Sequence, residues 1–248
     1  PLAGSADGDE GSASDEITIR LPKAQKTVVY GIAIAGGLGT YLLLGQLVGG
    51  GMGMPRFEAA EVGNLELTWL IPLSLIGTIC GWLYFVSEHA SEALAHAIGE
   101  RPVVKAMLAG LALAICGTVL PYTMFAGETQ ADVLMETYLT IPAGVLIATG
   151  LVKAMLTPAL INLGWRGGHF FPVIFSGVSL GYGLAILTGA DPVFCVAVCT
   201  ASTMGAVMRQ PVMVVGLLLM CFPLKGIVCM IIAAVIAAGI PLPKPLRK

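Results

Sequence analysis

The chain has 248 residues, of which 56% are hydrophobic and only 11% are charged, and its mean hydropathy is +0.88. A soluble domain averages about 25% charged residues, so this composition excludes an ordinary soluble protein and predicts an all-α polytopic membrane protein. The formal net charge is −2 and no basic stripe is present, so no nucleic-acid partner is expected.

The two ends of the chain differ from its middle. Residues 1–16 are mostly Gly, Ser, Ala and acidic residues, which predict a flexible acidic lead-in. Residues 17–243 form the predicted membrane part, and residues 244–248 a basic cytoplasmic tail. The sequence opens at Pro1 without an initiator Met or a signal peptide, which we interpret as a fragment or a processed product.

Long runs without charge mark the membrane segments, and several reach the ~20 residues that a spanning helix needs. Near the end of the chain lie two short apolar pieces, Val212–Phe222 and Leu224–Ile240, and the first is too short to cross a membrane alone. Such interrupted segments are typical of a transporter's binding region. In chain order, we expect apolar segments at Thr27–Val48, Leu67–Ser87, Pro102–Leu120, Pro142–Leu163, Phe170–Leu187, Pro192–Met208, Val212–Phe222 and Leu224–Ile240.

Two of these segments carry small residues at a spacing of four. The first has Gly31, Ala35 and Gly39, and the fifth has Gly177 and Gly181. Small residues at this spacing allow two helices to approach closely within a membrane. We therefore expect both segments to pack tightly against neighbouring helices.

The second segment has aromatic residues toward its ends and a polar continuation. Trp69, Trp82 and Tyr84 are interpreted as anchors at the membrane interface. The residues that follow, Glu88–Glu100, keep a helical pattern and predict an extension of the same helix. Connections are expected at the Gly-rich, then acidic Gly49–Glu66 and at the acidic stretch 128–136.

Two patterns raise the possibility of a metal site. His89, Glu92 and His96 share one face of the helical extension and suit zinc, although a solvated helix explains them equally. Cys195 and Cys199 are four residues apart, but no His lies nearby. All six cysteines lie in apolar runs and are interpreted as small hydrophobic residues, so no metal is expected.

The distribution of basic residues predicts the orientation. When the segments alternate across a cell membrane (inner or plasma membrane), the acidic connections fall outside and the C-terminus is cytoplasmic, as the positive-inside rule requires. The basic residues that then face the cytoplasm are Arg20, Lys23, Lys26, Arg101, Lys105, Arg166, Arg209, Lys244, Arg247 and Lys248.

One charged residue lies in the middle of a predicted membrane segment rather than near its end. Lys153 falls in the middle of Pro142–Leu163, where a charge is costly and often has a function. Either Lys153 attracts anions, or it snorkels to the surface or pairs with a neighbouring segment. The sequence does not decide between these roles.

The stretch Gly164–Pro172, which reads GWRGGHFFP, separates two apolar segments. Gly167 and Gly168 allow the backbone to bend, and Pro172 is tolerated in the first turn of a helix. One interpretation is a helix that begins at membrane depth, where its unpaired N–H groups carry positive partial charge and suit an anion. The other is a loop at the membrane surface that begins an ordinary spanning helix.

The same residues resemble a known family. Gly168-His169-Phe170-Phe171-Pro172 matches the GxFxP motif of the ClC chloride channel and transporter family, and the run from Met204 to Pro211, MGAVMRQP, resembles that family's later GA…RxP run. The amino-acid sequence from Trp165 to Gly181 is similar to that of a bacterial branch of the family, the YfeO-like ion-channel proteins. By segment order, residues 17–243 resemble the second half of such a protein.

The resemblance implies two inverted halves with helices that stop within the membrane, a homodimer, and an inorganic anion as the transported ligand without any cofactor. It implies that chloride or a similar halide is bound at Gly168, His169, Phe170 and Phe171, by the backbone N–H groups of His169 and Phe170 above all. Gly167 and Pro172 would support the helix start. The His169 side chain would either face the pore, where its charge near neutral pH would tune anion occupancy, or pack outward.

Some expected features of the family do not occur in this sequence. Its GSGIP and GREGP motifs, the second of which carries the gating glutamate, belong to a first half that is missing here. Pro241-Leu242-Pro243 stands where a pore tyrosine would be expected. Channel and proton-coupled antiporter are therefore not separated by the sequence.

The sequence is compatible with three functions. The leading hypothesis is an anion-transporting half-protein in a lipid bilayer that works with its missing N-terminal half. The second is a non-transporting membrane subunit that packs against a partner half. The third is an intramembrane enzyme at His89, Glu92 and His96, but no base lies at helical spacing from Ser202 or Thr203, and an enzyme is not expected.

Overall fold

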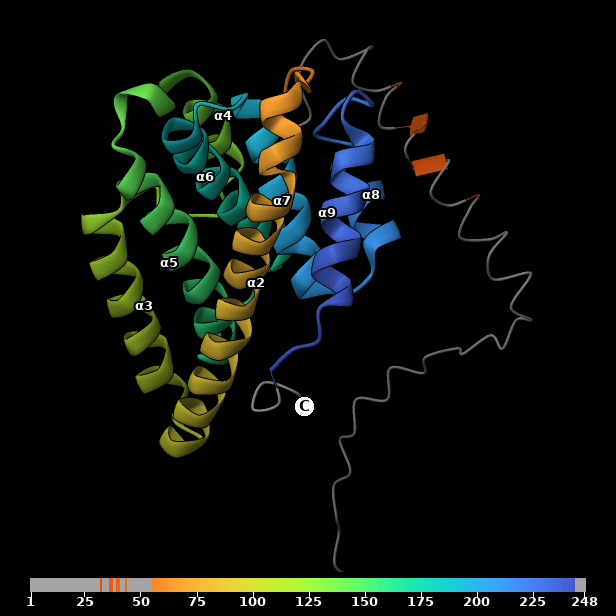
Figure 1. Ribbon diagram of the computed structural model, residues 1–248. Helices are drawn as coiled ribbons and strands as arrows, with labels where there is room; N and C mark the ends of the chain where they lie inside the picture. Colours follow the sequence, from red (N-terminus) through yellow and green to blue (C-terminus); the bar gives the residue numbers. More distant parts are fainter. Residues whose placement is uncertain (1–31, 33–35, 38, 41–42, 44–54, 244–248) are drawn as a thin grey trace, which may run out of the picture. The chain divides into compact units, whose positions relative to one another are not determined.

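The structure is a computed structural model that describes residues 32, 36–37, 39–40, 43 and 55–243 (Figure 1). The chain divides into two compact units, Pro1–Gly50 and Gly51–Lys248. The six described residues of the first unit are helical. The rest of the expected segment Thr27–Val48, the predicted lead-in 1–16 and the predicted tail 244–248 lie outside the described residues.

The second unit is all-helical over residues 55–243, and we refer to its elements by the labels in Figure 1. Four of its helices, α2, α3, α5 and α6, are long and apolar enough to cross a membrane by length and composition. The elements are α2 (Asn64–Ile98), α3 (Pro102–Val119), η1 (Pro121–Thr123), α4 (Glu128–Thr137), η2 (Tyr138–Thr140), α5 (Ala143–Asn162), α6 (Phe170–Thr188), α7 (Pro192–Met208), α8 (Pro211–Leu218) and α9 (Ile227–Gly239).

Helix α2 is the longest element, with 35 residues, and it continues through the polar extension predicted after Ser87. Its first turn is fixed because the backbone N–H of Gly63 donates to the Glu66 carboxylate. The other oxygen of that carboxylate accepts the backbone N–H of Asp191, so the start of α2 is tied to the connection between α6 and α7.

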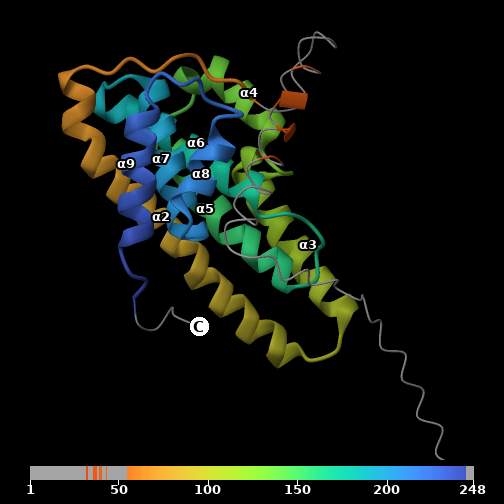
Figure 2. The ribbon, with the colours of Figure 1, turned by 90° about the vertical axis from the view of Figure 1, so that its right-hand side faces the viewer.

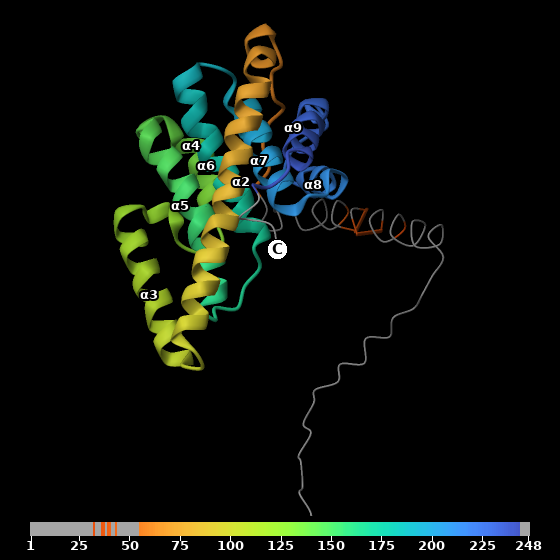
Figure 3. The same cartoon turned by 60° about the horizontal axis from the view of Figure 1, so that its bottom comes forward.

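Around α2, the helices lie on two sides. Helix α3 lies at the outer edge beyond α5, and α8 and α9 lie at the opposite edge (Figures 1 and 2). Helices α6 and α7 form the centre, where most of their residues are buried. Helix α3 has a single buried residue, Ala109, and stands at the margin of the unit (Figure 3).

The expected close packing at Gly177 and Gly181 is confirmed. A Cβ atom at Gly177 would lie 2.4 Å from the Cα atom of Thr200, and one at Gly181 would lie 2.5 Å from the Cα atom of Val196. Both neighbours belong to α7. Only glycine therefore fits at these two positions of α6, as close helix contacts in membranes require.

The acidic connection predicted at residues 128–136 contains a short helix that the sequence did not reveal, α4, which is followed by η2. Helix α4 is amphipathic, with Ala131 and Leu134 buried, but the acidic residues between its few apolar positions made this pattern difficult to recognise in the sequence. Helix α8 has only eight residues, which confirms that this piece is short. Five of the six cysteines are buried, all except Cys116, and all six are free thiols.

Candidate functional site

The start of α6 follows an open Gly-rich turn. Helix α5 ends at Asn162, and the chain then turns through Gly164, whose φ is +94°. Gly167 and Gly168 lie in open space, since a Cβ atom at either would meet nothing within 4 Å. His169 is the N-cap residue, and the first helical hydrogen bond is donated by Val173 to the carbonyl of His169.

The backbone N–H groups before that first bond lack partners. Within the part of the chain that the structure describes, no acceptor is found for the N–H groups of Gly168, His169, Phe170 or Phe171. Pro172 has no N–H group, so Val173 is the first residue of the turn with a satisfied donor. Unpaired donors at a helix start carry positive partial charge and suit an anion.

A cavity of about 240 Å³ lies beside this turn, between α3, η1 and α5. Gly167, Gly168 and Pro172 line it from the α6 side, whereas Lys153 and Leu156 come from the middle of α5. The start of α6 therefore lies beside the span of α5 rather than beyond its end. The remaining lining residues are Leu113, Thr123, Phe125, Ala126, Thr157, Leu160, Ile161, Trp165 and Arg166, so that none of the lining side chains is acidic.

Lys153 is buried, with 4% of its surface exposed. Its Nζ atom donates to the carbonyl oxygen of Thr123 at 2.7 Å and also to that of Phe125. Phe125 adopts a left-handed backbone with φ of +57°, which is uncommon for a large side chain. This geometry matches the alternative in which Lys153 pairs with a neighbouring segment, although Lys153 also lines the cavity.

The His169 ring packs against aromatic neighbours. It stacks on the Phe170 ring with centroids 4.7 Å apart, and its centroid lies 6.4 Å from that of Tyr84 on α2. Tyr84 is only 8% exposed, so the expectation that it anchors the membrane interface is wrong. The sequence missed this contact because Tyr84 lies 85 positions before His169, and nothing local reveals such a pairing.

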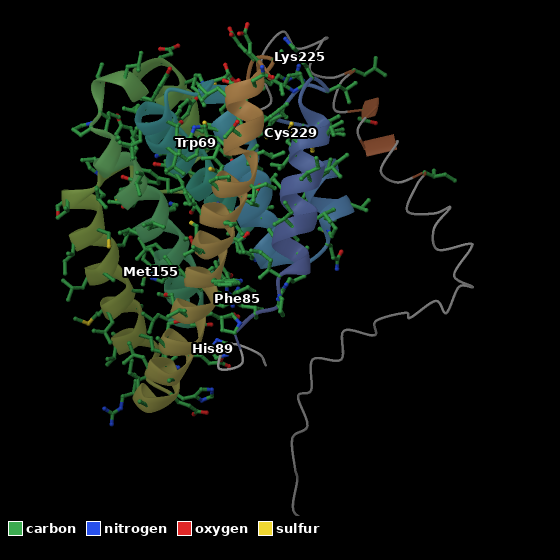
Figure 4. The ribbon with its side chains drawn as sticks, viewed as in Figure 1. Trp69, Phe85, His89, Met155, Lys225 and Cys229 are labelled. Carbon is green, nitrogen blue, oxygen red and sulfur yellow. The ribbon has the colours of Figure 1, made fainter. Side chains whose placement is uncertain are left out.

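The groups considered for metal binding do not assemble. Among the described residues, no group of three or more His, Cys, Asp or Glu side chains is arranged to hold a metal ion. The Nδ1 atom of His89 lies 2.9 Å from the carbonyl oxygen of Phe85, one turn earlier on the same helix. Both residues lie toward the far end of α2 from Trp69 (Figure 4), and Ser87 between them donates to the carbonyl of Met155 of α5.

Sequence reasoning also missed the turn between η1 and α4, which supplies both carbonyl acceptors of Lys153. In the sequence, Pro121 and Gly127 were the signals for this turn. The structure shows why a glycine is suited there, because the φ of Gly127 is +108°. These two residues indicate a turn but not its partner. The structure thus brings Gly167, Gly168, Pro172 and Lys153 to one cavity, while His169 and Phe170 do not line it.

Several apolar helices of spanning length, one of which starts at a turn with unpaired N–H groups, define a multi-pass helical membrane protein. A family model described as voltage gated chloride channel matches residues 16–241. The chain therefore belongs to the voltage gated chloride channel family, a family of anion transport proteins, as the GxFxP resemblance predicted. The narrower YfeO-like assignment stays a prediction.

One solved structure that matches is titled "Crystal structure of a CLC-type fluoride/proton antiporter". The two chains share 21% sequence identity with a TM-score of 0.63, so the likeness shows the fold alone. The match covers 79% of this chain and 49% of the other, so this chain spans about half the length of the protein it matches. No curated protein matches this chain.

Proposed function

We propose that this chain forms half of an anion pathway and binds chloride or a similar halide at the start of α6. In this proposal, the backbone N–H groups of His169 and Phe170 are the principal donors, and those of Gly168 and Phe171 complete the turn. The observation that carries the proposal is the run of four consecutive N–H groups without acceptors among the described residues.

The chemistry of these donors favours a halide. Partial charges on N–H groups hold a large, weakly hydrated anion without a full positive charge that would trap it. The adjoining cavity supports the proposal because its lining includes Lys153 and Arg166 but no acidic side chain. The Lys153 ammonium would favour anions near the turn even while it donates to two carbonyl groups.

A complete pathway is proposed to need a second half, because this chain spans about half of the solved structure it matches. That half would supply the facing side of the anion site and any gating carboxylate. We further propose a homodimer in the cell membrane with a cytoplasmic C-terminus, as the distribution of basic residues predicts, and no cofactor besides the transported anion.

The proposal is tested by reconstituting the purified protein into vesicles loaded with chloride or with fluoride and recording anion efflux with ion-selective electrodes. Fluoride is included because a solved structure with the same fold is titled a fluoride/proton antiporter. Simultaneous recording of external pH separates a channel from a proton-coupled exchanger. Halide binding is measured in parallel by calorimetry.

Either of two results would contradict the proposal. Folded protein that neither binds a halide nor releases one would support the alternative of a non-transporting subunit that packs against a partner half. Transport that persists after the N–H groups at 169 and 170 are removed would show that the anion uses a different part of the protein.

A further inference from the structure

The cavity between α3 and α5 has two ends of different chemistry. At the deep end, near Lys153, polar groups are satisfied internally: the Thr123 hydroxyl donates to the Leu120 carbonyl at 2.7 Å, and the Thr157 hydroxyl donates to the Lys153 carbonyl at 2.9 Å. The Lys153 ammonium is held by two carbonyl groups. The hydroxyl donors at this end are therefore engaged, and the Lys153 ammonium keeps one of its three hydrogens for a further acceptor.

The other end carries the unpaired polar groups. The Arg166 side chain has no partner among the residues that the structure describes, and the same holds for the N–H groups of Gly167 and Gly168. Trp165, which is 41% exposed, lies next to Arg166. Tryptophan and arginine side by side are typical of the level of lipid head groups.

The wall between the two ends is aliphatic, with Leu113 from α3 and Leu156, Leu160 and Ile161 from α5. From Lys153 to Ile161, the helix rises about 12 Å. Helix α3 covers this wall only loosely, because Ala109 is its single buried residue and most of its large side chains, though not Leu113, are exposed. The wall is thus continuous with a helix surface of the kind that faces lipid.

We propose that this cavity is a binding site for an anionic phospholipid, a ligand distinct from the transported anion. The phosphate group lies on Arg166 and the N–H group of Gly167, and one acyl chain lies along the wall between α3 and α5. Charge complementarity argues for an anionic head group, since none of the side chains lining the cavity is acidic. The lipid site adjoins the proposed halide site at Gly168 but uses neither of the two principal halide donors, because His169 and Phe170 do not line the cavity.

Trp165 provides a direct test. The chain has three tryptophans, so replacing Trp69 and Trp82 by Phe leaves Trp165 as the chain's only indole reporter. The protein is reconstituted in phosphatidylcholine vesicles that contain, at equal mole fraction, phosphatidylglycerol or phosphatidylcholine brominated on the acyl-chain carbons closest to the head group. Bromine quenches a tryptophan only in contact, so the quenching reports an acyl chain beside Trp165.

We expect stronger quenching by the brominated anionic lipid. Arg166→Gln should lower this preference about fivefold, because one basic residue near a membrane surface attracts anionic lipid by that factor. Arg101→Gln is the matched control: Arg101 is an exposed arginine just before α3 and does not line the cavity. Leu113→Phe, which fills the cavity, should lower quenching by either lipid while leaving Arg166 in place.

Several results would overturn the proposal. Equal quenching by the two head groups would remove the anionic preference, and equal losses in Arg166→Gln and Arg101→Gln would reduce it to general surface attraction. Loss of the preference on adding millimolar inorganic phosphate would identify free phosphate as the ligand. Absence of quenching by both lipids would show that protein, rather than lipid, covers the cavity.

Discussion

The Nζ atom of Lys153 lies 2.7 Å from the carbonyl oxygen of Thr123, a residue thirty positions earlier in the chain. A second bond from the same atom reaches the carbonyl of Phe125. The lysine in the middle of α5 therefore closes the turn that links η1 to α4. Lys153 also lines the cavity beside the start of α6. The same side chain therefore holds the turn between η1 and α4 in place and forms part of the candidate site.

Replacing Lys153 by methionine should destabilise the protein. The long apolar side chain fills the same space, but the buried carbonyl of Thr123 is left without a donor, which costs roughly 1–3 kcal/mol. We expect a lower midpoint of thermal unfolding in detergent than for the wild type. Lys105→Met, which removes a lysine outside the cavity, is the control and should unfold like the wild type.

The same variant tests whether Lys153 attracts anions. If it does, Lys153→Met should lower the anion flux at low ionic strength and weaken the dependence of that flux on salt. A flux with an unaltered salt dependence, together with a lower unfolding midpoint, would assign Lys153 a structural role alone.

Phe170→Pro should weaken halide binding in the complete protein. Proline is tolerated at the first position of a helix, but it deletes one of the N–H groups proposed to bind the anion. A hydrogen bond to a charged group contributes about 1.5–3 kcal/mol, so affinity should fall about tenfold or more by calorimetry. Phe170→Leu keeps the N–H group and is the control. Folded Phe170→Pro protein with wild-type affinity would contradict the site.

A paired substitution at His169 separates its backbone from its side chain. His169→Pro removes the N–H group, and the residue before it is a glycine, which tolerates a following proline better than the αR residue that precedes position 170. His169→Phe keeps the N–H group and preserves a ring to stack on Phe170. We expect halide affinity to fall for His169→Pro and to be retained for His169→Phe.

If both His169 variants lose affinity equally, the imidazole itself takes part, and the packing of this ring against Phe170 and Tyr84 is not its whole role. Comparing wild type and His169→Phe from pH 5 to pH 8 gives a second readout, because histidine changes charge within this range. With a backbone site, the two pH profiles should have the same shape.

Gly181→Ala should loosen the contact between α6 and α7. The added Cβ atom would lie 2.5 Å from Cα and 2.8 Å from N of Val196, both backbone atoms that cannot move aside. Overpacking of this kind costs about 1–3 kcal/mol. Gly110→Ala in α3 meets nothing within 4 Å and should be neutral or stabilising by about 0.5–1 kcal/mol. Equal unfolding midpoints for the two variants would contradict the packing described.

The sequence alone determined the segments and the family, because both are written in local patterns. Uncharged apolar runs and flanking prolines predicted Pro192–Met208 with the bounds that α7 has in the structure, and Gly-Gly followed by Pro172 placed the start of α6. The GxFxP motif gave the family that the match over residues 16–241 established. Helix α4 was missed because its apolar pattern is short and interrupted by acidic residues.

Only the tertiary structure decided which distant residues meet. The bond from Lys153 to Thr123, the burial of Tyr84 near His169 and the cavity between α3 and α5 all join positions far apart in the sequence. Hydrophobic periodicity and turn signals determine how each segment folds locally, since they act over a few residues. Which side chains face each other depends on how whole helices pack, and no local pattern carries that information.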